Sequence, residues 1–172
     1  KAEWSFLTLL SALSVREAIA SLDSTTQIDI KWPNDLLIGE KKCAGIIAQA
    51  TEKGVVIGIG INVNQLHFEN LPQASSLALL ESKTFDKEEI MIKIANQLQI
   101  NLENAQKIGA NLYWERYHEL LYKRGVVSVF EDVNGNQFVG KISAVTHEGK
   151  LQLELENNAL SFFDLKEIKM LY

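Results

Sequence analysis

A cation and a carboxylate lie four residues apart in the segment Lys-Trp-Pro-Asn-Asp that begins at Lys31. Apolar and polar residues alternate over 27–32, which predicts a strand with Lys31 on the face away from the core. Pro33 cannot donate to a sheet ladder and should end the strand, and Asn34 and Asp35 suit a tight turn. Such a pair at a strand end could hold an anionic ligand, because open sheets bind ligands there. The plain alternative is a surface lysine beside an ordinary turn.

The strand predicted over 55–63 has one face of β-branched residues, expected to be solid core, and a second face that carries Gly58, Gly60 and Asn62. A glycine weakens a strand by about 0.5–1 kcal/mol relative to alanine, so two on one face need a reason. One explanation is a slot for a flat or slender ligand with the Asn62 amide at its end; the other is a helix packed tightly against the glycines. Because Gly58-Ile59-Gly60 lacks a third glycine and opens no helix, it is not a dinucleotide fingerprint.

Simple alternation in the strand predicted over 42–52 places Cys43 and Gly45 on one face. A glycine inside a strand again suggests close approach of a ligand or another backbone. Cys43 is the only cysteine, so it is either a reactive thiol or a small buried apolar side chain. No intrachain disulfide can form, which favours a reducing, cytoplasmic compartment.

The composition of the 172 residues is that of a globular protein, with 47% hydrophobic and 23% charged residues. The net charge of −5 argues against a general binder of nucleic acid or of membrane surfaces, since both need a basic face. His67, His118 and His147 show no metal-ligand spacing, and no apolar run is long enough to span a membrane. The sequence starts at Lys1, directly on a helical pattern, so we expect a piece of a longer protein.

Periodicity divides the chain into two parts with a boundary near residue 124, because closely spaced short strands after that point suggest a small barrel. Asp86 is a predicted helix N-cap, and Asn134-Gly135 predicts a two-residue type I′ hairpin. The predicted helices cover residues 4–22, about 87–105 and about 110–123. The predicted strands cover residues 27–32, 36–39, 42–52, 55–63, 126–130, 137–145, 150–155, 160–163 and 167–170.

Three ordered motifs together resemble the biotin protein ligases. They are Lys31-Trp32-Pro33-Asn34-Asp35-Leu36, Lys42-x-Ala44-Gly45-Ile46 and Gly58-Ile59-Gly60-Ile61-Asn62. Ala74-Ser75-Ser76-Leu77 is similar to a further family segment. The resemblance implies an α+β fold: residues 1–124 as the C-terminal portion of a class II synthetase-like ligase domain with a mixed sheet and packed helices, and residues 125–172 as a small SH3-like barrel.

The resemblance also implies an enzyme that uses ATP and Mg²⁺ to convert biotin to biotinyl-5′-adenylate, then biotinylates a lysine of a biotin carboxyl carrier domain. Lys31 would hold the biotin carboxylate and the α-phosphate as they react, which is reasonable because a cation there stabilises the developing charge. No residue is assigned to a metal, no nucleic-acid or membrane partner is implied, and a homodimer is possible. The remaining implied site residues are Leu36, Gly45, Gly58 and Gly60 for biotin, and Asn34, Asp35 and Asn62 for the nucleotide.

One family feature is missing from these residues: the basic glycine-rich loop, with a Ser/Thr-Thr-Asn segment and several strands, that precedes the three motifs. We therefore expect little biotin-dependent ATP–pyrophosphate exchange from residues 1–172 alone. Two alternatives stay open: an octanoyl- or lipoyl-transferring enzyme of the same superfamily, with Cys43 as acyl acceptor, and a non-catalytic biotin-binding fragment.

Overall fold

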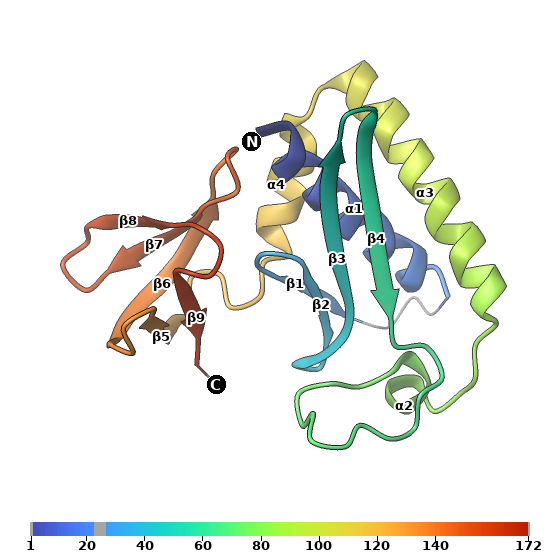
Figure 1. Cartoon of the computed structure of the whole chain (residues 1–172), viewed down its shortest axis with the longest axis horizontal. Helices are drawn as coiled ribbons and strands as arrows, with labels where there is room; N and C mark the ends of the chain where they lie inside the picture. Colours follow the sequence, from blue (N-terminus) through green and yellow to red (C-terminus); the bar gives the residue numbers. More distant parts are fainter. Residues whose placement is uncertain (1, 23–26, 172) are drawn as a thin grey trace.

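The computed structural model describes residues 2–22 and 27–171, which form two antiparallel sheets with helices (Figure 1). The first sheet has its four strands in chain order: β1 (Ile28–Lys31), β2 (Asp35–Ile38), β3 (Lys41–Thr51) and β4 (Gly54–Ile61). The expected mixed sheet is therefore not found among the described residues, because short turns join consecutive strands. Between β2 and β3, Gly39 and Glu40 both have positive φ (52° and 67°), as a two-residue type I′ hairpin requires.

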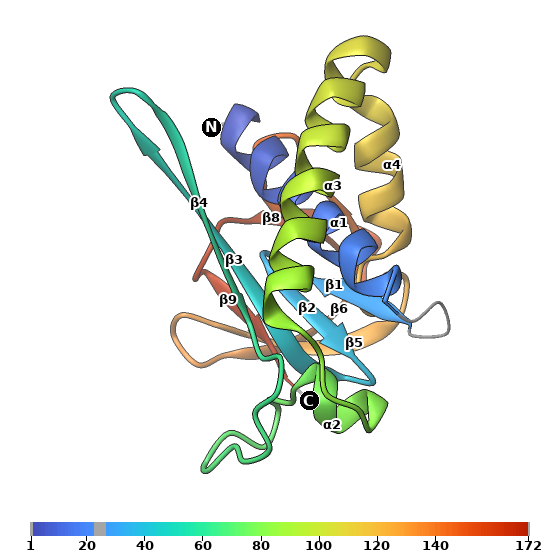
Figure 2. The ribbon, with the colours of Figure 1, turned by 90° about the vertical axis from the view of Figure 1, so that its right-hand side faces the viewer.

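Three helices cover one face of this sheet: α1 (Ala2–Ala20), α3 (Lys87–Ile108) and α4 (Asn111–Glu119) (Figure 2). α1 contacts all four strands and both other helices, and its Leu10 and Leu13 are fully buried. Ser11 and Ser14 of α1 are also fully buried, and each donates to the backbone carbonyl four residues earlier at 2.7 Å. These three helices do not cover the opposite face of the sheet (Figure 2), which is called the outer face below.

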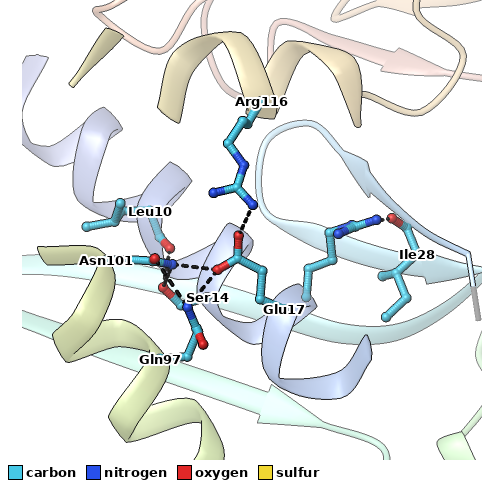
Figure 3. Close-up of polar contacts among 8 residues, drawn as sticks. Leu10, Ser14, Glu17, Ile28, Gln97, Asn101 and Arg116 are labelled. Atoms are coloured by element: carbon cyan, nitrogen blue, oxygen red, sulfur yellow. Dashed lines mark hydrogen bonds and ion pairs between the residues drawn. The ribbon is translucent and has the colours of Figure 1, made fainter. Parts of the chain in front are cut away.

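A polar network joins α1 to α3 and α4 (Figure 3). The Glu17 carboxylate accepts hydrogen bonds from Gln97 at 3.0 Å and Asn101 at 2.8 Å and pairs with Arg116. Asn101, only 3% exposed, also donates to the Ser14 hydroxyl at 3.0 Å. The Asn101–Ser14 bond is buried and the bonds to Glu17 are partly buried, so the network helps to fix the three helices relative to one another.

The helix boundaries follow local signals. Asp86 caps α3 as predicted, with its carboxylate accepting from the Glu88 amide at 2.8 Å. α4 ends at Glu119, earlier than predicted, and Gly125 (φ 74°) follows in the turns before the second sheet. A short helix, α2 (Leu77–Glu81), was not predicted; Ser76 caps it by accepting from the Leu79 amide at 3.2 Å.

The second sheet contains the five strands predicted after residue 124: β5 (Val127–Asp132), β6 (Gln137–Val145), β7 (Leu151–Leu155), β8 (Leu160–Phe163) and β9 (Ile168–Met170). Their order in the sheet is β8-β7-β6-β5-β9. The predicted type I′ hairpin at Asn134-Gly135 is wrong, because Gly135 has positive φ (83°) but Asn134 does not. Instead, the Asp132 carboxylate accepts from the amides of Asn134 and Asn136 at 2.8 and 2.9 Å and organises a wider turn.

The second sheet contacts the motif that begins at Lys31. The Trp32 indole donates to the Gly149 carbonyl at 3.0 Å, and Trp114 of α4 stacks on His147 with ring centroids 4.8 Å apart. The Gly125 amide donates to the Ile142 carbonyl at 2.8 Å. These contacts place β5–β9 beside the end of β1.

Candidate functional site

Four of the predicted site residues form one row across the first sheet. Lys31 pairs with Asp35, Asp35 with Gly45, and Gly45 with Gly60. Directly paired residues point to the same side of a sheet, so this row lies on one face. It is the outer face, because the next row, Ile30, Leu36, Ala44 and Ile61, faces the helices.

An ion pair lies over the middle of this row. The Lys42 ammonium is 2.6 Å from the Asp35 carboxylate, and the two side chains are 47% and 24% exposed. A Cβ at Gly45 would lie 3.3 Å from Asp35 Oδ1 and 3.4 Å from Lys42 Nζ, which is tight. The absence of a side chain at Gly45 therefore lets the pair rest against the strand.

Lys42 was not among the predicted site residues, because alternation puts it on the face opposite Gly45. A β-bulge changes that. Leu36 pairs with Ala44 while Leu37 pairs with Lys42, so Cys43 is an extra residue in β3. Lys42 is returned to the outer face. The available signal was its position at the start of the second motif, three residues before Gly45.

The same bulge corrects the prediction that Cys43 shares a face with Gly45. The Cys43 side chain is fully buried among core residues, and its thiol donates to the Leu36 carbonyl at 3.4 Å. Burial raises the pKa of the Cys43 thiol to about 12. A thiol that stays protonated and out of solvent is a poor acyl acceptor.

The glycines of β4 face open space. A Cβ at Gly58 would meet nothing closer than the Ile47 carbonyl at 3.8 Å, and one at Gly60 nothing closer than the Gly45 carbonyl at 4.0 Å. The helix that could have packed against them lies on the other face, so that alternative is wrong for the described residues. Gly45, Gly58 and Gly60 thus form a bare strip, called the glycine floor below.

The opposite face of β4 is less buried than predicted. Ile57, Ile59 and Ile61 are half-buried, and of the predicted core face only Val63 is buried. α3 covers this face in part and leaves an apolar groove of about 430 Å³ between β4 and α3. The strand alternates as predicted, but it does not have a solid core face.

The remaining predicted residues fall into different surroundings. Leu36 is fully buried on the helix-covered face and does not join the glycine floor. The Asn34 amide donates to the Ile46 carbonyl, and the Ile46 amide donates back to the Asn34 carbonyl at 2.9 Å, so Asn34 fastens the turn to β3. Asn62 donates to the Ser75 carbonyl at 3.1 Å.

Lys31 stands at the end of the row nearest the second sheet. Together with Asn34 and Asp35 it lines a cavity of about 410 Å³, which Lys166 and Lys169 line from the other side. The outer face therefore offers the ammonium groups of Lys31 and Lys42 beside a floor without side chains. Ammonium groups bind carboxylates and phosphates, and the bare floor suits a slender ligand.

Residues 2–22 and 27–171 contain no group of three or more His, Cys, Asp and Glu side chains placed to hold a metal ion. Across the same ranges, no helix has both the length and the hydropathy needed to cross a membrane.

Comparison with known proteins agrees with this geometry. Residues 1–65 match the Biotin/lipoate A/B protein ligase family. A biotin--[acetyl-CoA-carboxylase] ligase of Mycobacterium tuberculosis is 29% identical over 154 residues, covering 88% of this chain and 58% of the relative. The bifunctional ligase/repressor BirA of Bacillus subtilis is 35% identical over 161 residues, covering 86% and 48%. The chain thus spans about half the length of these relatives.

Solved structures agree in fold. The biotin protein ligase of Aquifex aeolicus superposes with a TM-score of 0.83 at 23% identity, covering 98% of this chain and 75% of that one. A structure of the same Aquifex protein in complex with biotin and ATP gives a TM-score of 0.82. The family match over residues 1–65 and these relatives make the chain similar in sequence to biotin protein ligases, and the solved structures show that it shares their fold.

Proposed function

We propose that these residues form part of a biotin protein ligase that activates biotin with ATP and passes it to a lysine of a biotin carboxyl carrier domain. The observation that carries the proposal is the row Lys31, Asp35, Gly45 and Gly60, with the Lys42–Asp35 ion pair seated over Gly45. The Mycobacterium and Bacillus relatives are both named as ligases, which supports this reading.

The chemistry has two steps. In the first, a biotin carboxylate oxygen attacks the α-phosphorus of ATP, an O–P bond forms, and pyrophosphate leaves. In the second, the carrier lysine amine attacks the carbonyl of biotinyl-5′-adenylate, AMP leaves, and the amine loses a proton. Both steps concentrate negative charge near the carboxylate and the α-phosphate, where a fixed cation lowers the barrier.

Each residue has a proposed part in these steps. Lys31 remains the proposed catalytic cation, and Lys42, held in place by Asp35, is a second cation on the same face. The glycine floor would bind biotin, and Asn62 would contact the nucleotide. Leu36 would support the site indirectly, because its buried side chain packs in the core on the other side of the sheet from the glycine floor.

Asn34 and Asp35, proposed from the sequence for the nucleotide side of the site, have described partners already. Asn34 fastens the turn to β3, and Asp35 pairs with Lys42. Their proposed contribution is to shape the site around the α-phosphate. The described residues offer no group of three or more carboxylate, imidazole or thiol side chains that could hold a resident Mg²⁺, and we propose that the ion arrives with the substrate as Mg–ATP.

The finer architecture belongs to the same proposal. We propose a ligase unit up to about residue 124 and a second unit over 125–172 that is an SH3-like barrel, supported by the five-stranded antiparallel sheet. A cytoplasmic location is supported by the cysteine usage, because the one cysteine, Cys43, is buried and the chain uses no disulfide. A homodimer completes the proposal.

The test measures the second step, because transfer of biotin from a preformed adenylate does not require the basic glycine-rich loop to hold the phosphates of ATP. The 172-residue protein is mixed with biotinyl-5′-adenylate and a purified biotin carrier domain, and the carrier is weighed by mass spectrometry. We expect transfer above the rate without protein, and loss of transfer with Lys42→Ala.

Each alternative has its own outcome in this test. Octanoyl-adenylate used in preference to biotinyl-adenylate would indicate the acyl-transferring alternative. Calorimetric binding of biotin without any transfer would indicate a binding fragment. Absence of both binding and transfer would refute the proposal.

A further inference from the structure

The backbone of Lys42 is held by a loop where the regular sheet stops. β4 pairs with β3 as far as Ile61, which lies opposite Ala44. Beyond that point residues 73–75 take the place of β4 beside β3, with Ala74 bridged to Lys42. The Lys42 amide donates to the Gln73 carbonyl at 2.7 Å, and the Ser75 amide donates to the Lys42 carbonyl at 2.9 Å. We call residues 73–75 the brace.

Asn62 fastens the brace to the sheet. Its backbone amide donates to the Cys43 carbonyl at 2.8 Å, which fixes Asn62 beside the bulge. Its side-chain amide donates to the Ser75 carbonyl at 3.1 Å. Ser75 is only 7% exposed, so the carbonyl that receives this bond belongs to a buried residue and would be costly to leave unpaired.

The brace matters because the bulge weakens the pairing of Lys42 with β2, the strand on its other side. On its other side Lys42 pairs with Leu37 at the point where the β2–β3 register shifts. A bulge disrupts the ladder locally, so the direction of Lys42 depends on the brace more than a regular strand residue would. That direction carries the ammonium over Gly45 to Asp35.

We propose that Asn62 is a positioning residue that acts through Ser75 to aim Lys42 across the glycine floor. The inference rests on the proposed function in one respect only, the role of Lys42 toward the ligand. It goes beyond a nucleotide contact for Asn62, because it assigns the Asn62 side-chain amide to the protein's own backbone.

The first test needs no ligand. Amide hydrogen exchange is measured by NMR for the parent and for Asn62→Asp, which keeps the shape of the side chain but removes its N–H donor. The matched control is Asn64→Asp, because Asn64 lies two residues on and its side chain bonds only the backbone of Phe85 among described contacts, at 2.9 and 3.0 Å.

We expect Asn62→Asp to speed exchange of the Lys42 and Ser75 amides by about tenfold, the effect of losing one hydrogen bond. The Ile46 amide, bonded to Asn34, should not change. The control should leave Lys42 unchanged. Unchanged exchange at Lys42 in Asn62→Asp would overturn the brace. Asn62→Ala, which adds no carboxylate beside a carbonyl, repeats the measurement if Asn62→Asp melts too early.

The second test is a double-mutant cycle on biotin affinity, measured by calorimetry. If Asn62 acts through Lys42, Asn62→Asp weakens biotin binding in the parent but changes it less than twofold in the Lys42→Ala background. An equal loss in both backgrounds would show direct action on the ligand and overturn the positioning role. If exchange responds as expected but neither variant changes affinity, the brace stands and the proposed function of Lys42 fails.

Discussion

Replacing Gly60 by valine tests whether the glycine floor binds biotin, because the substitution should affect ligand binding without harming the fold beneath the floor. Gly60 lies in regular strand without positive φ, and a Cβ there would meet only the Gly45 carbonyl, at 4.0 Å. The new side chain would therefore stand on the outer face without a clash, in the space that the proposal gives to biotin. Stability and binding should respond in opposite directions.

The magnitudes follow from these surroundings. Replacing a strand glycine at a compatible φ stabilises a protein by about 0.4–1 kcal/mol, and valine is a good strand former. For a chain of this size that raises Tm by roughly 1–4 °C. Overfilling the floor should cost about 1–3 kcal/mol of binding, which weakens biotin roughly 5- to 150-fold. Gly58→Val should behave in the same way, with added contact to the exposed Ile47 opposite.

The assay pairs thermal melts with calorimetric titration of biotin. Gln49→Val is the matched control, because it places the same side chain on an exposed position of the same face, opposite Val56 and far from Asp35. It should leave biotin affinity unchanged. Ile59→Ala, on the half-buried face, should cost about 1–3 kcal/mol of stability but spare affinity in the folded fraction. A Gly60→Val protein that binds biotin as tightly as the parent would refute the floor.

Three further predictions test the charges and the thiol. Lys42→Ala and Lys31→Ala should each lower the rate of adenylation in a ligase containing this chain by a factor of ~10²–10³, which is typical for loss of charge stabilisation. Lys31→Arg should restore little of that rate. A near-normal rate in either alanine variant would remove that lysine from the reaction. Cys43 should resist alkylation in the folded protein, because burial raises the pKa of its thiol to about 12; rapid labelling would contradict the buried position. Burial lowers the pKa of His118, so its contribution to stability should be complete above about pH 6.5 and decline as the pH falls below that value. His118→Gln should therefore reduce the fall in Tm between pH 7.5 and 5.5. An unchanged fall in Tm would show that other groups cause it.

The parts of the fold that local chemistry determines were predictable. Alternation in 55–63 predicted that Gly58 and Gly60 share a face, because a strand has a fixed period of two. Asp86 predicted the start of α3, because an aspartate side chain satisfies the free amides of the first turn. The five short strands after residue 124 were also found, since turn residues separate them.

The parts that depend on pairing between distant segments were not predictable. The antiparallel pairing of all four strands of the first sheet depends on the turns that join them, and the mixed sheet came from resemblance alone. The half-buried face of β4 depends on how far α3 extends over it. The turn at Asn134 depends on Asp132, whose carboxylate gathers nearby amides and outweighs the preference of the Asn-Gly pair.

One extra residue in β3 decides which side chains meet at the candidate site. With strict alternation, Lys42 would point at the helices and Cys43 would lie beside Gly45. A lysine in that apolar core would have to lose its charge or find a buried partner, at a cost of several kcal/mol. The bulge removes that cost by placing the small, apolar Cys43 in the core and the charge of Lys42 next to Asp35. Because the bulge exists only in the pairing of β2 with β3, the alternation of residues along β3 could not reveal that Lys42 lies on the outer face, and its place in the second motif was the one signal in the sequence.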